Sequence, residues 1–315
     1  MVFLFQMGIG ISLNLFLFLF YSRTVTASRK FSPSDLILIH LAFSNAVILL
    51  SFGLSETLSY WGLRNFLSDV GCKILMYVYR VGRGLSICST CLLSVFQAVT
   101  ISPGTTRWAR IKARLARGVV LSCLLSWGLS LLVDLDALFN ITGPRNSSVA
   151  RMMLDLKYCS KLSDSAETTL LIAVVFSLRD LFFVGLMSLA SGYMVFVLHR
   201  HHRQVRHLHG SGRSSGEMPE VQAAKRVVAL VTLYVLLYGR QSVMLSVILN
   251  RKEKSPLLTN SHLVFSITFS SMSPLLMIHG DRRMRTFWKR ESAVSHVDSA
   301  VEFQGSRLPA QRENS

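Results

Sequence analysis

The segment Cys72–Pro103 reads CKILMYVYRVGRGLSICSTCLLSVFQAVTISP and decides the fold. It is long enough to cross a bilayer as a helix, which takes about 20 mostly apolar residues. Its first half nevertheless carries Arg80 and Arg83, and a charge near mid-bilayer costs at least about 2.5–3.5 kcal/mol. These side chains must therefore face protein or water, so the segment is predicted to be a helix inside a bundle. Ser102-Pro103 ends it, because the residue before a proline avoids the helical conformation.

The composition of the chain points to a membrane protein. Of its 315 residues 50% are hydrophobic, and the mean hydropathy is +0.42, which is too apolar for an ordinary soluble domain. The net charge of +17 would suit a nucleic-acid partner, but charge alone does not define a basic face. No nucleophile elbow, phosphate-binding glycine loop or pair of catalytic carboxylates is found, so no enzyme and no cofactor are predicted.

Apolar stretches recur along the chain at the length of a membrane span. Each is separated from the next by a polar or basic loop, and the loops include 56–71, a basic loop over 107–117, and the stretches 139–167 and 199–216. We therefore predict an all-α membrane protein with seven transmembrane helices in residues 1–279. Residues 280–315 are predicted to be a cytoplasmic tail with a short amphipathic helix around Met284, Phe287 and Trp288. The predicted spans are 2–21, 34–55, 72–103, 118–138, 168–198, 223–249 and 259–279.

The distribution of basic residues orients these spans. When Lys73, Lys225 and Arg226 at the span ends are counted with the adjoining loops, the loops after spans one, three and five and the tail hold 21 of the 34 Lys and Arg, whereas the other three loops hold 9. The positive-inside rule then places the N-terminus outside. The acceptor sequons at Asn140 and Asn146 fall on the same outer side, where glycosylation takes place. The basic excess is thus explained by cytoplasmic loops beside anionic membrane lipid, without nucleic acid.

The run RVGRGLSICSTCLLSVFQAVTISP resembles the third helix of the vomeronasal type 1 receptors. LRDLFFVGLMSLASGYMVFVLHRHH and LYVLLYGRQS carry the same resemblance. Phe96-Gln97-Ala98 replaces the usual Asp-Arg-Tyr of rhodopsin-like receptors, and Ser273 to Met277 replaces Asn-Pro-x-x-Tyr, as in that family. The resemblance implies a rhodopsin-like bundle in the plasma membrane that binds small pheromone-like ligands and signals to a heterotrimeric G protein. Its implied G-protein contacts are Gln97, Arg107, Arg110, Lys225 and Arg226.

Charged side chains inside the spans are candidates for a ligand pocket. They lie in the outer halves of spans three, five and six, so they can converge on one outward-facing cavity. The alternative is a structural ion-pair network around Asp180. Because one Asp cannot neutralise four arginines, positive charge is expected to remain for a small anionic or hydrogen-bonding ligand. The candidate ligand-binding residues are Tyr79, Arg80, Arg83, Arg179, Asp180, Arg240 and Gln241.

Two further features follow from the orientation and the resemblance. Cys72 and Cys159 both fall outside, and the resemblance implies that they form the disulfide common to rhodopsin-like receptors, the alternative being two free thiols. Asn45 stands where most such receptors have a sodium-binding Asp, and we expect it to form interhelical hydrogen bonds instead.

The sequence also allows other interpretations. The histidines between His199 and His209 lack nearby carboxylates or thiols, so a solvated basic face is expected there and no metal site. A bitter-taste-type receptor shares the missing Asp-Arg-Tyr. A small-solute transporter or channel would require internal repeats, which the sequence does not show.

Overall fold

The protein is described here from a computed structural model, which places residues 2–27, 32–62, 67–103, 105–142, 152–156, 159–162, 166–208, 219–250, 264–281, 283–284 and 286. Met1–Leu276 forms one compact unit and Met277–Ser315 a second. Within the described residues, six helices are long and apolar enough to cross a membrane. The seventh predicted span is visible as a shorter helix, Thr268–Gly280, and its first residues lie outside the described part. Most of the predicted amphipathic tail helix also lies outside it.

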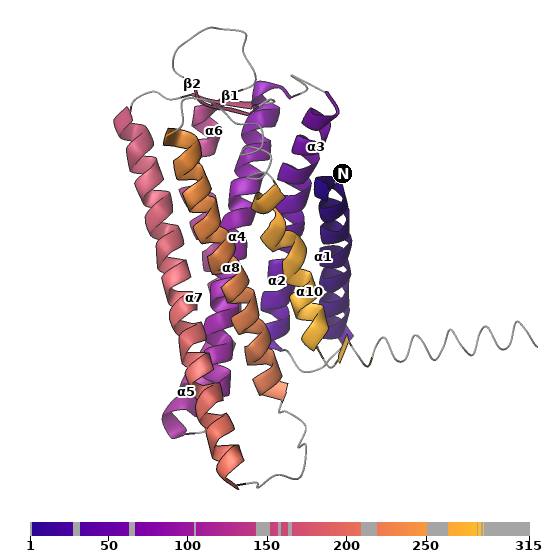
Figure 1. The fold of residues 1–315 in the computed structure, drawn as a ribbon, viewed down its shortest axis with the longest axis vertical. Helices are drawn as coiled ribbons and strands as arrows, with labels where there is room; N and C mark the ends of the chain where they lie inside the picture. The colour runs from indigo at the N-terminus through magenta and orange to yellow at the C-terminus, as the bar shows by residue number, and fades with distance from the viewer. Residues whose placement is uncertain are drawn as a thin grey trace, which may run out of the picture. The chain divides into compact units, whose positions relative to one another are not determined.

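The elements form a helical bundle with a small sheet at one end (Figure 1). A π-helical turn, Leu49–Gly53, joins α2 to α3. The bounds are α1 Val2–Ala27, α2 Pro33–Ile48, α3 Leu54–Tyr60, α4 Asp69–Ile101, α5 Thr106–Val133, α6 Asp136–Asn140, β1 Ile141–Thr142, β2 Met152–Leu156, β3 Cys159–Leu162, α7 Ala166–Leu208, α8 Pro219–Asn250 and α10 Thr268–Gly280.

Helix α4 covers residues 72–101 of the segment Cys72–Pro103 and is the centre of the bundle, as predicted. It packs against α2, α5, α7 and α8, and 72% of its most apolar window is buried. Ser68 caps its first turn by accepting a hydrogen bond from the amide of Gly71 at 3.2 Å. The helix ends at Ile101, immediately before Ser102-Pro103. Its two arginines therefore lie among other helices rather than against lipid.

Three predicted loops are wrong at their edges because helices continue into them. The second span extends through the π-helical turn to Tyr60, although a loop was expected from residue 56. The basic loop over 107–117 is instead the first part of α5, and α7 continues to Leu208 through the predicted loop 199–216. Straight-chain basic residues have good helix propensity, and no Gly or Pro interrupts 105–117 or 199–208. Charge marks where the apolar core ends, not where the helix ends.

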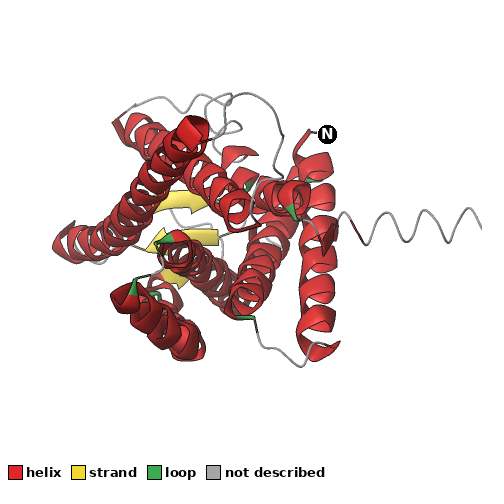
Figure 2. Ribbon diagram, turned by 90° about the horizontal axis from the view of Figure 1, so that it is seen from below, coloured by secondary structure: helices red, strands yellow, loops and turns green. Residues whose placement is uncertain are grey.

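The sheet covers one end of the bundle and is called the sheet end below. Its strands run in the order β1-β3-β2 with antiparallel pairing, in a region predicted only as a polar loop. The end-on view of Figure 2 shows the strands lying across the far end of the helices. A disulfide joins Cys72 at the start of α4 to Cys159 at the start of β3. The bond holds the sheet against the end of the central helix.

Gly10 on α1 is required by close packing against α10. A Cβ there would lie 2.8 Å from Ser271 Oγ and 3.0 Å from Ser271 Cα. We expect Gly10→Ala to destabilise the bundle by about 1–3 kcal/mol through overpacking, measured as a lower unfolding midpoint in detergent. Gly8→Ala is the control, since a Cβ at Gly8 has nothing within 4 Å. Equal midpoints for the two variants would show that α1 and α10 are not in close contact.

Candidate functional site

A small cavity opens inside the bundle, between α2, α4, α8, the first turn of α10 and the segment that leads into it. Its volume is about 50 Å³, enough for a few water molecules at roughly 15 Å³ each. The wall combines aromatic rings with hydroxyl groups and one cationic side chain. The lining residues are Ile48, Tyr79, Arg83, Ser86, Tyr234, Leu237, Tyr238, Phe265, Ser266, Phe269 and Ser270.

Among the described residues of this wall, Arg83 is the only charged one. Its side chain remains 36% exposed although it sits among packed helices. Tyr79 lies one turn earlier on α4 and stacks on Phe52, with ring centroids 4.9 Å apart. The two residues share a face of α4 because their spacing is i, i+4. An acceptor group in the cavity would therefore meet the Arg83 guanidinium with tyrosine hydroxyls around it.

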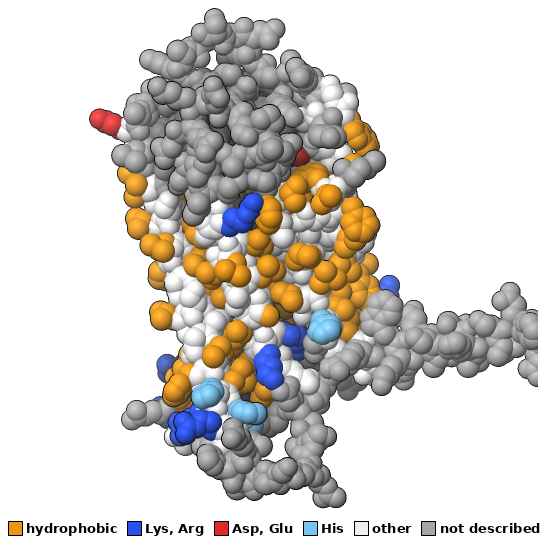
Figure 3. Space-filling view, in the orientation of Figure 1, with side chains coloured by type: hydrophobic (Ala, Val, Ile, Leu, Met, Phe, Trp, Pro, Cys, Tyr) orange, Lys and Arg blue, Asp and Glu red, His pale blue; other side chains and the backbone are white. Residues whose placement is uncertain are grey.

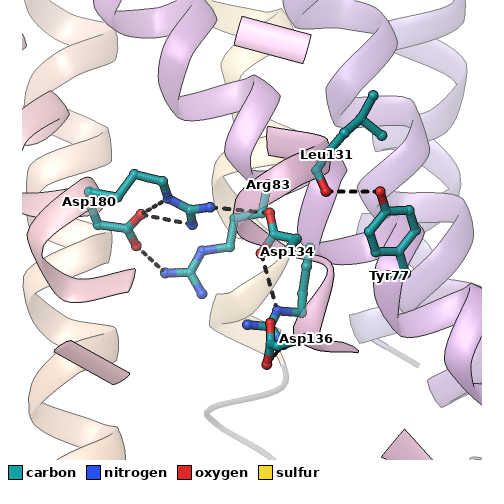
Figure 4. A network of polar contacts seen from close by, with 8 residues as sticks. Tyr77, Arg83, Leu131, Asp134, Asp136 and Asp180 are labelled. Carbon is teal, nitrogen blue, oxygen red and sulfur yellow. Dashed lines mark hydrogen bonds and ion pairs between the residues drawn. The ribbon is translucent and has the colours of Figure 1, made fainter. Parts of the chain in front are cut away.

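Arg83 is also the first member of a chain of alternating charges that leads away from the cavity (Figure 4). Its Nη2 donates to Asp180 Oδ2 at 3.0 Å. The neighbouring Arg179 holds the other oxygen of Asp180, with its Nη2 3.0 Å away. Arg179 Nη1 in turn donates to Asp134 Oδ2 at 3.2 Å. The chain thus links α4 to α7 and α7 to the end of α5.

The chain continues from Asp134 toward the sheet end. Arg80 Nε lies 3.3 Å from Asp134 Oδ1, an ion pair without hydrogen-bond alignment. Arg80 Nη1 donates to Asp136 Oδ2 on α6 at 3.1 Å. We call the whole set the charge ladder: Arg83, Asp180, Arg179, Asp134, Arg80 and Asp136.

The ladder corrects the expectation that a single Asp faces four arginines. Asp134 and Asp136 were missed from the sequence because they lie at the end of the fourth span and were not counted among its intramembrane charges. They were nonetheless detectable as two carboxylates at the outer end of an apolar stretch in an acid-poor chain. With them the ladder holds three arginines and three carboxylates and is formally neutral. The charges form a structural network, and Arg83 also lines a cavity, where ligand binding stays a prediction.

An aromatic ring supports the two arginines that lie outside the cavity wall. The guanidinium carbon of Arg80 lies 4.1 Å from the centroid of the Phe176 ring, and that of Arg179 lies 5.0 Å away. Cation–π contacts of this kind stabilise by about 0.5–2 kcal/mol. They keep Arg80 and Arg179 on the α7 side of α4, so these arginines support the site without lining it.

Arg240 lies behind the cavity wall. Its guanidinium carbon is 3.2 Å from the centroid of Phe265, which lines the cavity. Its Nη1 is buried and has no hydrogen-bond partner among the described residues. The side chain of Gln241 lies outside the described residues. Of the seven predicted ligand-binding residues, the structure therefore places Tyr79 and Arg83 in the wall and Arg240 next to it.

The ladder ends beside the disulfide at the sheet end. Asp136 precedes Ala137, which packs in a buried cluster with Ile141, Cys72 and Cys159. A movement of α6 would therefore displace residues of both the ladder and the sheet. Asn140, one of the predicted glycosylation sites, is the last residue of α6, and Asn146 lies outside the described residues.

A hydrogen-bonded path leaves the cavity on the side away from the sheet. Ser86, in the wall, donates to Asn45 Oδ1 at 3.0 Å. Asn45 Nδ2 donates to Ser273 Oγ at 2.9 Å, directly before Pro274 in α10. The prediction that Asn45 forms interhelical hydrogen bonds is confirmed. The path connects α4, α2 and α10.

The five residues predicted to touch a G protein have different environments. Gln97 is buried, with 5% of its surface exposed. Arg110 and Lys225 are exposed, while Arg226 is half-buried and donates to the Gln222 carbonyl at 3.4 Å. The side chain of Arg107 is not described. Contact through Gln97 would therefore require the helices to separate.

Comparison with known proteins gives one family. The model of the vomeronasal organ pheromone receptor family matches residues 1–290. "Olfactory receptor class A-like protein 1" of Danio rerio is 37% identical over 90% of this chain and 89% of its own length. "Vomeronasal type-1 receptor 3" of Homo sapiens is 38% identical over 88% of this chain and 89% of its own.

The fold has a solved counterpart. Squid rhodopsin superposes with a TM-score of 0.70 over 91% of this chain and 77% of its own, at 16% identity. At that identity the match establishes the rhodopsin-like bundle and nothing about the ligand.

Proposed function

Since the chain belongs to the vomeronasal organ pheromone receptor family, we propose that the cavity around Arg83 is its ligand-binding site. The protein is a multi-pass chemoreceptor of the plasma membrane and of the G-protein-coupled class, and it is not an enzyme. The bitter-taste-type receptor and the transporter or channel gain no support from these relatives.

The observation that carries the proposal is the position of Arg83 at the junction of the cavity and the charge ladder. A small ligand with an anionic or hydrogen-bond-accepting group would bind Arg83 and compete with Asp180. Asp180 would keep Arg179 as its partner, so the competition leaves no carboxylate unpaired. Tyr79 would contact the ligand directly, whereas Arg80, Arg179, Asp180 and Arg240 would act from behind the wall. Gln241, whose side chain is not described, stays a prediction.

Ligand binding must enlarge the cavity. Ligand pockets usually have about 300–1,000 Å³, far more than the space around Arg83. A ligand that prefers an expanded form shifts the population toward it, in proportion to its differential affinity for the two forms. The path from Ser86 through Asn45 to Ser273 would carry this change toward α10.

The remaining assignments follow from the same orientation. We place the N-terminus and the sheet end outside and propose that Asn140 and Asn146 carry glycans. The opposite end then faces the G protein, which would be contacted by Gln97, Arg107, Arg110, Lys225 and Arg226. Exposure of Arg110 and Lys225 supports this arrangement, and the burial of Gln97 fits a contact made only in the activated form.

Arg83→Ala is expected to weaken agonist potency about 10- to 100-fold, because a hydrogen bond to a charged group is worth about 1.5–3 kcal/mol. The agonist is first found with the unmodified receptor, by screening volatile and water-soluble compounds in cells with a calcium reporter. Potency is then compared at matched surface expression. Lys73→Ala is the control, since Lys73 lies on the same helix but outside the cavity wall. Unchanged potency of the Arg83 variant would remove the cavity from ligand binding.

A further inference from the structure

The first turns of α5 carry a row of arginines on one face. Arg107, Arg110, Arg114 and Arg117 are spaced i, i+3, i+7 and i+10, which places them on a common side of a helix. The side chains of the last three are exposed. No acidic residue occurs from 105 to 133. We call Arg110, Arg114 and Arg117 the arginine stripe.

The same face of α5 continues as a lipid-facing surface. Four leucines on it, which follow the stripe at helical spacing, are each 60–70% exposed although they are strongly apolar. In a membrane-spanning helix, such residues face lipid chains. The arginine stripe therefore points outward from the bundle, on the lipid-facing side of α5, not into the interior of the bundle. The leucines are Leu121, Leu124, Leu125 and Leu132.

Lys112 shows the contrast on the same helix. It lies off the stripe, and its Nζ donates to the Thr100 carbonyl at the end of α4 at 3.0 Å. The Lys112 ammonium group is therefore bound within the protein, by the backbone of α4. Arg117 Nε donates only to its own helix, to the Ala113 carbonyl at 3.2 Å, and no ion pair to Arg110 or Arg114 is found within the described residues. The stripe is thus available to an external anion.

The depth of the stripe matches lipid headgroups. With a rise of 1.5 Å per residue, Arg117 lies about 6 Å and Arg110 about 16 Å below the lipid-facing Leu121. The headgroup layer of one leaflet is only about 5–8 Å thick. Arg117 thus lies within the headgroup layer and Arg110 beyond it, on the aqueous side. A headgroup that carries additional phosphates would extend toward Arg110. Figure 3 shows Lys, Arg and His side chains gathered at the lower end of the view, below a hydrophobic band.

We propose that the arginine stripe binds an anionic phospholipid with a polyphosphorylated headgroup in the cytoplasmic leaflet. The proposal rests on the orientation given above, because anionic lipids are concentrated in that leaflet. Arg114 and Arg117 would hold the inner phosphates, and Arg110 an outer one. Arginine suits this task because its planar guanidinium binds phosphate oxygens in a bidentate manner.

The test measures binding of fluorescent short-chain phosphatidylinositol bisphosphate to the purified full-length receptor, without G protein. Arg114→Gln combined with Arg117→Gln should weaken binding about 25-fold, at about fivefold for each arginine. Lys112→Gln combined with Lys73→Gln removes the same net charge off the stripe and should change affinity less than twofold. Unfolding midpoints establish that both variants are folded.

The competing occupants are separated by the following results. Equal losses in both double variants would overturn the proposal in favour of general charge attraction. Equal affinity for phosphatidylserine at matched total charge would overturn the preference for a polyphosphorylated headgroup. Free inositol trisphosphate that binds as tightly as the lipid would show a soluble anion site instead. If the variant with Arg114→Gln and Arg117→Gln binds the lipid normally and fails only in G-protein activation, the stripe contacts the G protein and not lipid.

Discussion

Replacing Asp134 by asparagine is expected to destabilise the receptor by about 3–5 kcal/mol, because breaking these buried ion pairs leaves the ladder with one positive charge that no carboxylate balances. Asp134 is 1% exposed and stands between Arg80 and Arg179 in the charge ladder. The variant leaves three arginines against two carboxylates, Asp136 and Asp180. Thermal unfolding of the detergent-solubilised receptor measures the loss. Glu167→Gln, which removes an exposed carboxylate at the start of α7, should stay within about 0.5 kcal/mol.

A double variant separates charge imbalance from lost packing. Adding Arg179→Gln to Asp134→Asn leaves two intact pairs, Arg80 with Asp136 and Arg83 with Asp180. We expect the double variant to recover most of the stability lost by Asp134→Asn alone, because the ladder is then neutral again, with two arginines and two carboxylates. If the loss in the double variant instead equals the sum of the losses in Asp134→Asn and Arg179→Gln alone, the ladder members act independently. That result would remove the ladder as a coupled network.

Loss of the disulfide is expected to have the second large effect. Cys72 and Cys159 are 87 residues apart in sequence, and removing a native disulfide that closes a long loop costs about 2–5 kcal/mol. Cys72→Ser combined with Cys159→Ser should lower the unfolding midpoint and release the sheet from the end of α4. A reducing agent should lower the midpoint of the unmodified protein by a similar amount and leave the double variant unchanged.

The remaining cysteines provide the control for this experiment. Cys88, Cys91 and Cys123 are buried free thiols within α4 and α5. A Cys123→Ser variant should respond to the reducing agent as the unmodified receptor does, since it keeps the disulfide. If the reducing agent does not affect the unmodified receptor, the bond between Cys72 and Cys159 does not support the fold.

The helices themselves were predictable because their signals are local. Each long apolar stretch was identified from about 20 consecutive residues, and Pro103 marked the end of α4. Helix ends were less predictable at α5 and α7, where arginines and histidines continue a helix that hydropathy alone would stop. The sheet was missed because its strands are short and β1 gains its pairing from a segment distant in sequence.

The sequence by itself determined a helical membrane bundle with buried arginines at its centre, because hydropathy and charge are properties of consecutive residues. Only the tertiary structure decided which carboxylates those arginines meet, and that Arg83 alone among the ladder arginines lines a cavity. The choice depends on how each helix is rotated about its axis and which neighbour it packs against. Asp134 and Arg80 lie on different helices, and no local pattern records that they are paired.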